Sequence, residues 1–394
     1  MSLYSLVLLV LALLSGLVMV WKVPLLPPVR AQEDAELAVS KNPGLVALKS
    51  QDLPASKSPE LAVSIIIPAR NEEHRLPPLL KSLAEQDYQP LEILVVDDHS
   101  TDHTAEVARQ GQATVVPAAE ISEGWIGKTR ACWSGALAAN GDTLVFLDAD
   151  TRLDHPDSLR RLVQAYARSG ASGMLSVQPY HTVVRWYESL SAIFNIILIA
   201  GMNRFTVFGQ RLTGAGAFGP CIVCRRADYF QVGGHEAVRG AVLDDLAIGQ
   251  LFQHHGLTVN CFGGRGVLSF RMYAEGFRQL IEGWTKNFGS AVSVVHPLIV
   301  FLLILWIGAG LATPIDLILA IGSKDLLRVA LYALACSAFL LEFTWLARKF
   351  GNFHPWLLVL YPFHFYFFII VFGWSLFMSK VLHTVRWRGR KVKV

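Results

Sequence analysis

The side chains that could do chemistry gather where apolar stretches of the chain end. Residues 143–147 form a short apolar run, and Asp148 and Asp150 follow it directly. Such a run is typical of a buried strand, and carboxylates at positions i and i+2 of an extended chain project from the same face. Two neighbouring carboxylates repel each other unless a cation lies beside them, and hard divalent cations prefer oxygen ligands. The pair therefore indicates a metal site, although an ordinary acidic turn fits the same residues.

Two earlier strands are also followed by polar residues. Residues 62–67 are continuously apolar and lead into residues 68–72, and residues 92–96 lead into Asp97 and Asp98. Helical patterns lie between these runs, which favours a βαβ arrangement and a parallel sheet covered on both faces. Right-handed crossovers bring the carboxyl ends of parallel strands to one edge of a sheet. We therefore expect the three strand ends to form a single site.

The composition indicates a membrane protein. Charged residues make up 17% of the chain and the mean hydropathy is +0.40, whereas average chains carry about 25% charged residues. Residues 3–21 are apolar, uncharged and long enough to span a bilayer. No positive residue precedes this stretch and Lys22 follows it, so we interpret it as a retained anchor with the body of the protein in the cytoplasm.

The C-terminal part of the chain creates a conflict of topology. Residues 297–320, 327–346 and 356–378 could each span the membrane, and the tail after them is strongly basic. A basic tail should be cytoplasmic, close to anionic lipid, but three full spans after a cytoplasmic domain would place it outside. One stretch must then be interfacial or re-entrant, or the stretch that contains Pro314 makes two short passes.

These patterns divide the chain into six regions. They are a membrane anchor (1–22), a linker (23–60), a catalytic domain (61–275), an interfacial or acceptor-side segment (276–296), C-terminal membrane helices (297–380) and a basic cytoplasmic tail (381–394). Within the domain, residues 186–208 carry a long apolar run and look like a helix lying on the bilayer surface, with a core helix as the alternative.

Four motifs resemble those of family 2 glycosyltransferases, in the same order. They are Ile66–Glu72, Val95–Asp102, Phe146–Asp150 and Leu243–Ala247. The resemblance implies an α/β fold of the GT-A type, with a mostly parallel central sheet and a nucleotide-sugar pocket. Residues 124–128, 176–181, 271–273, 283–287 and 387–390 are similar to bacterial carotenoid glycosyltransferases that act on diaponeurosporenoate. Ceramide glucosyltransferases and hopanoid-associated transferases are more distant relatives.

The resemblance also implies roles for individual residues. Those implied to bind the nucleotide sugar are Pro68, Ala69, Glu72, Asp97, Asp98, Lys128 and Asp148. Asp150, with Asp148 beside it, is expected to hold Mg²⁺ or Mn²⁺, which would neutralise charge on the departing nucleoside diphosphate. Those expected on the acceptor and diphosphate side are Gly219, Pro220, Trp284 and Lys286.

Asp244 and Asp245 resemble the family's Glu-Asp motif, with Asp in place of Glu at its first position. The second carboxylate takes the proton of the acceptor hydroxyl in inverting members, so Asp245 is the expected general base. The role of the shorter Asp244 stays open. If the acceptor is a carboxylic acid, it is already ionised, and Asp245 could position the sugar instead.

The sequence thus predicts a metal-dependent, inverting hexosyltransferase in the cell (inner or plasma) membrane, with a cytoplasmic catalytic domain. The expected donor is a UDP-hexose, first UDP-glucose, and the expected acceptor is a lipid, first a carotenoid carboxylate such as diaponeurosporenoate. A hopanoid, sphingolipid or diacylglycerol is the alternative acceptor, and no nucleic acid partner is expected. A nucleotidyltransferase would need a Gly-rich basic loop after the first strand, which residues 69–72 do not provide. A non-catalytic membrane scaffold would not need the complete set of motif carboxylates.

Overall fold

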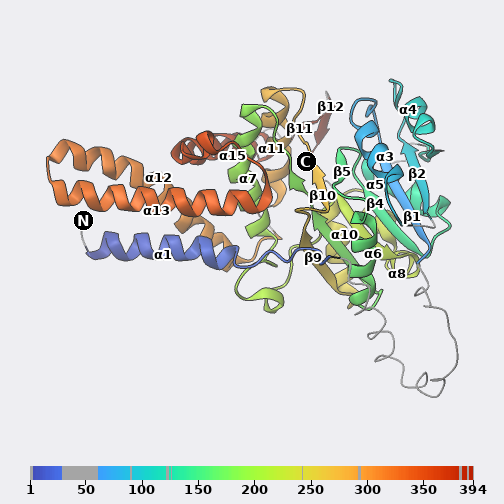
Figure 1. Ribbon diagram of the computed structural model, residues 1–394, viewed down its shortest axis with the longest axis horizontal. Coiled ribbons are helices and arrows are strands. Elements are labelled where there is room, and N and C mark those ends of the chain that lie inside the picture. The colour runs from blue at the N-terminus through green and yellow to red at the C-terminus, as the bar shows by residue number, and fades with distance from the viewer. Residues whose placement is uncertain are drawn as a thin grey trace, which may run out of the picture.

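The computed structural model comprises an α/β domain and a group of apolar helices that extend away from it (Figure 1). It describes residues 3–28, 61–88, 91–120, 124–125, 127–241, 243–291, 294–380, 384–387 and 390–393. The greater part of the predicted linker, residues 29–60, lies outside the described residues, as do the side chains of the basic tail.

A seven-stranded sheet organises the domain, in the order β3-β2-β1-β4-β8-β6-β9. Its strands are β1 (Val63–Ala69), β2 (Leu91–Asp97), β3 (Thr114–Pro117), β4 (Thr143–Leu147), β6 (Met174–Gln178), β8 (Cys221–Arg225) and β9 (Val259–Gly263). Neighbouring strands are parallel except β8, which runs antiparallel to both β4 and β6. The predicted, mostly parallel sheet is confirmed, and the carboxyl ends of β2, β1 and β4 lie next to each other.

Successive side chains of a strand point to opposite faces of the sheet, and they form two apolar layers, one on each face. On β1, Ile65 and Ile67 belong to one buried cluster, whereas Ile66 belongs to the other. This is the two-residue period of a strand that is buried on both faces. The first cluster includes side chains of α3 (Leu76–Ala84) and α6 (Ser158–Arg168), and the second includes side chains of α5 (Gly127–Ala138). The remaining helices of the domain are α4 (Thr104–Gln110), α8 (Arg226–Gln231), α9 (Gly234–Ala237) and α10 (Asp244–His254).

A small second sheet, β5-β10-β7, lies next to the end of β4. Its strands are β5 (Thr151–Leu153), β10 (Leu268–Phe270) and β7 (Tyr180–His181). β5 begins immediately after Asp150, so this sheet fixes the far side of the acidic segment that follows β4.

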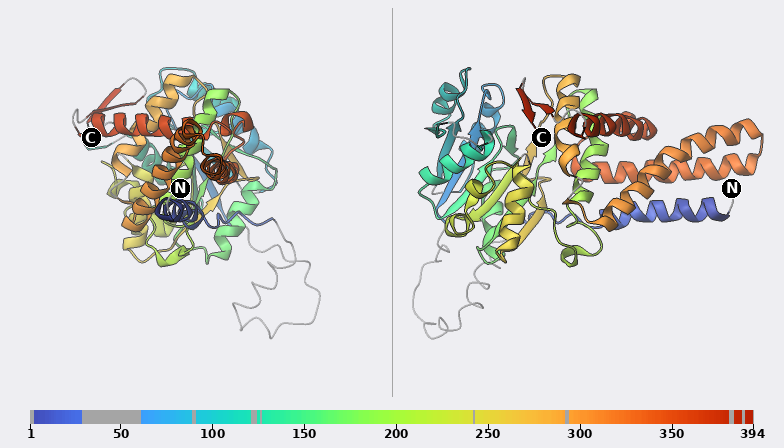
Figure 2. Two further views of the ribbon diagram at one scale, coloured as in Figure 1. Left: turned by 90° about the vertical axis from the view of Figure 1, so that its left-hand side faces the viewer. Right: turned by 180° about the vertical axis from the view of Figure 1, so that it is seen from behind.

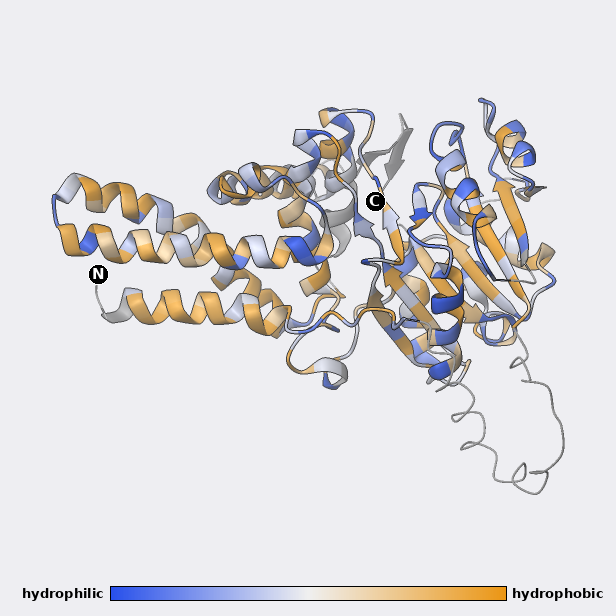
Figure 3. Cartoon of the chain, in the orientation of Figure 1, coloured by the Kyte–Doolittle hydropathy of each residue, from blue (hydrophilic) through white to orange (hydrophobic). Residues whose placement is uncertain are grey.

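Three helices are long and apolar enough to cross a membrane: α12 (Pro297–Ser323), α13 (Leu326–Phe350) and α15 (Tyr361–Lys380). The N-terminal helix α1 (Leu3–Met19) is shorter. α12 continues through Pro314 as a single helix, so it does not form two short passes. Apolar residues make up most of these helices, and α13 also carries hydrophilic residues near its ends (Figure 3).

α1, α12 and α13 pack side by side and extend in the same direction from the domain (Figure 1). Inside this bundle, Trp306 Nε1 donates a hydrogen bond to Glu342 Oε2 at 3.0 Å and joins α12 to α13. A Cβ at Gly16 of α1 would lie 2.8 Å from Trp306 Nε1. Glycine therefore allows α1 to approach this polar contact closely.

α15 has a different orientation. In the left view of Figure 2, α1 is seen along its axis while α15 runs across the picture. α15 packs along α11 (Phe277–Ala291), which belongs to the predicted acceptor-side segment. α15 thus lies across the direction of the other three helices. Residues 384–387 and 390–393 after it form the hairpin strands β11 and β12.

The expected surface helix at residues 186–208 is corrected by the structure. This stretch forms a 3-10 turn, η2 (Trp186–Leu190), and α7 (Ser191–Gly201), and nearly all of α7 is buried. Helix α7 lies between the domain and α12, α13 and α15, which pack against it. A helix that is apolar on all sides is typical of a buried position, and here protein covers it in place of lipid.

Candidate active site

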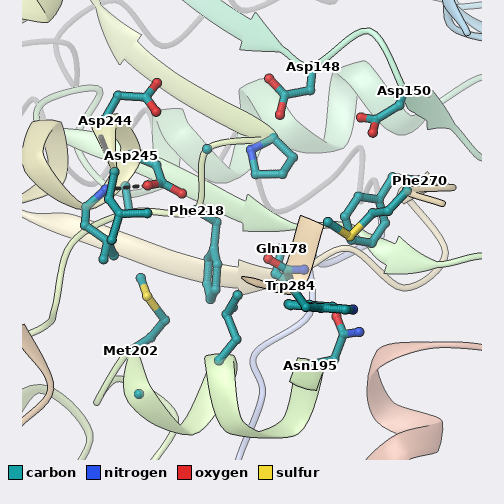
Figure 4. A pocket seen from close by; sticks show the side chains of 18 of the residues that line it. Asp148, Asp150, Gln178, Asn195, Met202, Phe218, Asp244, Asp245, Phe270 and Trp284 are labelled. Carbon is teal, nitrogen blue, oxygen red and sulfur yellow. Dashed lines mark hydrogen bonds between the residues drawn. The ribbon is translucent and has the colours of Figure 1, made fainter. Parts of the chain in front are cut away.

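Asp148 and Asp150 lie in a tight turn at the edge of the sheet. β4 ends at Leu147, so the assumption that the chain remains extended through Asp150 is wrong. The carbonyl of Asp148 accepts hydrogen bonds from the backbone N–H and the hydroxyl of Thr151, at 3.0 and 2.7 Å. The N–H of Asp148 donates to the carbonyl of Pro220 at 3.0 Å. The turn still directs both carboxylates toward one space (Figure 4).

Lys128 supplies the cation closest to this turn. Its Nζ lies 2.6 Å from Asp148 Oδ1. Burial alone would lower the pKa of the Lys128 ammonium, but Asp148 and Asp244 outweigh it and raise that pKa well above its usual range. Lys128 is thus a permanent positive charge between the carboxylates after β4 and those at the start of α10.

Asp150 is a carboxylate that lies close to other negative charges. Burial, with the charges of Asp148 and Glu72, raises the pKa of Asp150 to about 7. A divalent ion would hold this carboxylate in its ionised form, and carboxylate oxygen suits Mg²⁺ or Mn²⁺. In the part of the chain that the structure describes, no three His, Cys, Asp or Glu residues come close enough to bind a metal. Mg²⁺ often binds one or two carboxylates and completes its coordination with water and substrate phosphates.

The ends of β1 and β2 are tied together beside this turn. The N–H of Asp98 donates to the carbonyl of Ala69 at 2.8 Å. The carboxylate of Asp98 is buried and pairs with Arg130, and with Arg70 at 3.5 Å. Glu72 is also buried, and its N–H donates to Thr104 Oγ1 at 2.8 Å. Hydrogen bonds and ion pairs therefore hold the predicted nucleotide-binding loop at the edge of the sheet.

Asp97 is the exception among the predicted residues at this edge. Its Oδ1 accepts the backbone N–H of Ser100 at 3.0 Å, and the residue does not line the cavity. Adjacent side chains near the end of a strand point to opposite sides, so only Asp98 faces inward. In the structure the Asp97 carboxylate stabilises the turn at Ser100, and its contact with a nucleotide stays a prediction. Arg130 was not identified from the sequence, although its position two residues after Lys128 offered a signal.

Asp244 and Asp245 occupy the first turn of α10, across the cavity from the β4 turn (Figure 4). Asp245 Oδ1 accepts the N–H of Leu246 at 2.8 Å. Burial, and then the charge of Asp244, raise the pKa of Asp245 to about 6. A carboxylate with such a pKa is ionised at neutral pH and is basic enough to accept a proton.

Gly219 keeps the space between the base and the cation open. A Cβ at this position would lie 3.2 Å from Asp245 Oδ2 and 3.3 Å from Lys128 Nζ. The next residue, Pro220, accepts the hydrogen bond from Asp148. The segment before β8 thus joins both halves of the acidic site.

A single cavity of about 1110 Å³ collects the predicted residues. Its lining includes Pro68, Ala69, Glu72, Asp98, Lys128, Asp148, Asp150, Gly219, Pro220, Asp244, Asp245 and Trp284. Away from the carboxylates the walls become apolar, past Phe218 and Met202 (Figure 4). The cavity then continues between α12 and α15, where Ile304 and Ile369 line it with exposed fractions of 66% and 42%. It therefore opens on the outer surface of the apolar helices.

Comparison with known proteins assigns the family. The model of the family described as "Glycosyl transferase family 2" matches residues 64–231. The 4,4'-diaponeurosporenoate glycosyltransferases of Staphylococcus aureus strains Newman and COL are each 36% identical over 334 residues, 84% of this chain and 88% of theirs. The chain belongs to glycosyltransferase family 2. The GT-A fold and the enzyme class expected from the sequence are confirmed.

The search of solved structures found chains of low identity. A mannosyltransferase from Pyrobaculum calidifontis, in complex with GDP-Man and Mn²⁺, is 18% identical with a TM-score of 0.49, covering 92% of this chain and 99% of that one. Glucosyl-3-phosphoglycerate synthase from Mycobacterium tuberculosis, with Mn²⁺ and UDP-glucose, is 19% identical with a TM-score of 0.41, covering 68% and 84%.

Two of the residues that we predicted on the acceptor side of this glycosyltransferase, Trp284 and Lys286, differ in what the structure shows of them. Trp284 lines the cavity, but it is only 1% exposed, and its ring stacks on Phe194 at 4.8 Å between centroids. Its Nε1 donates to Ser191 Oγ at 3.1 Å. The Trp284 side chain is therefore held in the wall of the cavity. Only the small exposed part of its ring is accessible for the expected stacking on a ligand. Lys286 lies on α11, and its side chain is outside the described residues.

Gln178 and Asn195 line the apolar half of the cavity (Figure 4). Sequence reasoning gave neither a role. Gln178 belongs to one of the stretches similar to carotenoid glycosyltransferases, which was an available signal. Asn195 lies within the apolar run of α7, and nothing in the pattern distinguished it.

We predict that Gly219→Ala slows sugar transfer about tenfold with little change in thermal stability. The added methyl group displaces the Asp245 carboxylate by a few tenths of an ångström, and small misplacements of a reacting group carry large rate costs. The control is Gly240→Ala, because a Cβ there meets nothing closer than 3.5 Å. Steady-state kinetics of both variants checks this, and a wild-type rate for Gly219→Ala would contradict the geometry.

Proposed function

We propose that this glycosyltransferase transfers a hexose from a UDP-sugar, first UDP-glucose, to the carboxylate of a carotenoid acid held in the membrane. The continuous cavity carries the proposal, because it joins a charged end suited to a nucleotide sugar with an apolar end that opens on the membrane helices. The relatives named as 4,4'-diaponeurosporenoate glycosyltransferases support the acceptor class. A carotenoid acid is a long, rigid apolar chain with one terminal carboxylate. Its apolar chain matches the apolar end of the cavity, and its carboxylate matches the charged end.

The donor would lie over the carboxyl ends of β1, β2 and β4. Pro68, Ala69, Glu72 and Asp98 would contact the nucleoside, since they line that end of the cavity. Asp150 and Asp148 would hold Mg²⁺ or Mn²⁺, which when bound neutralises charge on the leaving diphosphate.

Lys128 would act on the same leaving group. Its ammonium lies within reach of Asp148 and remains protonated. With a diphosphate bound, Lys128 would pair with a phosphate oxygen, and Asp148 would be available to hold the divalent ion with Asp150. A fixed charge that needs no reorganisation during the reaction stabilises the transition state effectively.

The acceptor would reach the sugar from the apolar end. Attack from the side opposite the leaving diphosphate inverts the anomeric centre, and Asp245 faces the space between the two substrates. Toward a hydroxyl acceptor Asp245 would take the proton as general base. Toward a carboxylate acceptor no proton has to be removed, and Asp245 would position the sugar through its hydroxyls.

The arrangement of helices supports a cytoplasmic catalytic domain. The start of α1 and the α12–α13 connection lie at the same far end of the bundle (Figure 1). With α1, α12 and α13 as the spans and α15 along the membrane surface, the domain and the basic tail fall on the same side. This agrees with the positive-inside rule and with donors that are made in the cytosol.

We predict that Asp245→Asn lowers transfer to a hydroxyl acceptor by about a hundredfold or more, the usual contribution of a general base. Transfer to a carotenoid carboxylate should fall much less, because its nucleophile is already ionised. Product formation with both acceptors, followed by mass spectrometry, measures the difference. Equal losses with the two acceptors would contradict the assignment of Asp245 as a base.

The pH profile provides the control for this assignment. With a pKa raised to about 6, Asp245 loses its proton-accepting form as the pH falls below that value. Transfer to the hydroxyl acceptor should therefore decline on the acid side. Asp244→Asn removes the neighbouring charge, so the pKa of Asp245 falls and the acid limb moves to lower pH. An acid limb that stays in place in Asp244→Asn would show that another group titrates.

We predict that Gly308→Phe on α12 blocks the apolar end of the cavity. Nothing lies within 4 Å of a Cβ at Gly308, and the residue lines the cavity, so the ring can enter without disturbing the helix. The KM for a carotenoid acid should rise about tenfold or more, as expected for an obstructed apolar pocket. UDP-glucose hydrolysis should be unchanged.

Gly322→Phe is the matched control, since it lies on the same helix, has equally free surroundings and is not part of the lining. If both variants keep the wild-type KM for the acceptor, the acceptor does not use the groove between α12 and α15.

A further inference from the structure

A second, smaller hollow of about 510 Å³ lies at the domain-side end of α13. Three segments form it: the turn between β9 and β10, the last turns of α13, and α14 (Pro355–Leu358) with the residue after it. Its lining consists of Arg265, Leu340, Leu341, Thr344, Trp345, Arg348, Lys349, Pro355 and Val359. It shares no residue with the catalytic cavity, so it is a separate site.

This inference rests on the proposed topology, in which the hollow lies at the boundary between the bilayer and the cytoplasm. Lys349 Nζ donates to the carbonyl of Val20, one residue after the end of α1, at 3.3 Å. Trp21, Trp345 and Trp356 gather at this level with exposed fractions of 59%, 46% and 57%. Exposed tryptophans are typical of the headgroup region of a membrane. The hollow therefore lies at the depth of lipid headgroups.

The hollow concentrates positive charge. Arg265, Arg348 and Lys349 line it, and within the described part of the chain none of the three pairs with a carboxylate. Lys349 Nζ lies 3.4 Å from the centroid of the Trp345 ring, which holds the ammonium in place. The acidic residue on the same stretch, Glu342, points into the bundle and is bonded to Trp306. The charge is thus left for an external anion.

Apolar residues continue from this charged end along the outside of α13. Leu341 and Val359 are 71% and 59% exposed, and Leu340 is half-buried beneath them. A soluble anion would use only the cations, whereas a lipid would use the cations with its phosphate and the apolar flank with its acyl chain. We propose that this hollow binds an anionic phospholipid of the cytoplasmic leaflet, with the phosphate between Arg265 and Arg348.

The test compares lipid retention by the full-length protein and by Arg265→Gln/Arg348→Gln. Each protein is placed in nanodiscs of phosphatidylcholine that contain phosphatidylglycerol. Native mass spectrometry then counts the phosphatidylglycerol molecules that remain bound after the protein is released from the nanodisc. Each arginine near an anionic surface contributes roughly a factor of five, so the double variant should bind about thirty-fold more weakly. Arg328→Gln is the matched control, because Arg328 is exposed in the first turn of the same helix, at the opposite end.

Retention equal to the wild type in the double variant would overturn the proposal, and so would an equal loss in Arg328→Gln. Thermal unfolding in phosphatidylcholine alone shows whether the variants are folded, and we expect their midpoints to agree with the wild type. A second arm replaces the lipid by inorganic phosphate and detergent. We expect no saturable phosphate binding there, and binding as strong as that of the lipid would show that the site takes soluble anions.

Discussion

The structure depends on the gathering of negative charge at the carboxyl ends of β1, β2 and β4. Asp98, Asp148 and Asp150 meet there, and Asp244 and Asp245 face them from α10. Arg130 and Lys128 compensate Asp98 and Asp148, but Asp150 retains a pKa raised to about 7. Burial of like charges is costly, and a cation bound beside Asp150 would offset that cost.

The second constraint is the change from charge to hydrocarbon within one cavity. Gly219 leaves the passage between Asp245 and Lys128 open, and Phe218 begins the apolar wall immediately before it. α7 carries this wall from the domain to α12 and α15. The burial of α7 between the domain and the apolar helices thus keeps the acidic end of the cavity apart from its apolar end.

The acidic site could be predicted from the sequence because strand ends of a parallel sheet meet by a general rule. Asp97 could not be separated from Asp98, since which of two adjacent side chains faces inward depends on where the strand ends. The segment 186–208 was misplaced because hydropathy does not distinguish a helix covered by lipid from one covered by protein. The orientation of α15 and the groove beside α12 arise from packing between distant segments, and no local pattern encodes them.

The most direct measurement is sugar transfer by the purified enzyme in nanodiscs, with UDP-glucose, a carotenoid acid and a series of Mn²⁺ concentrations. We expect a product heavier than the acceptor by one hexose residue, formed only with a divalent ion. The product should be absent with Asp150→Ala and present with Asp142→Ala, whose side chain is exposed at the opposite end of β4. Transfer that persists in a chelator, or an Asp150→Ala enzyme that Mn²⁺ still stimulates normally, would contradict this expectation.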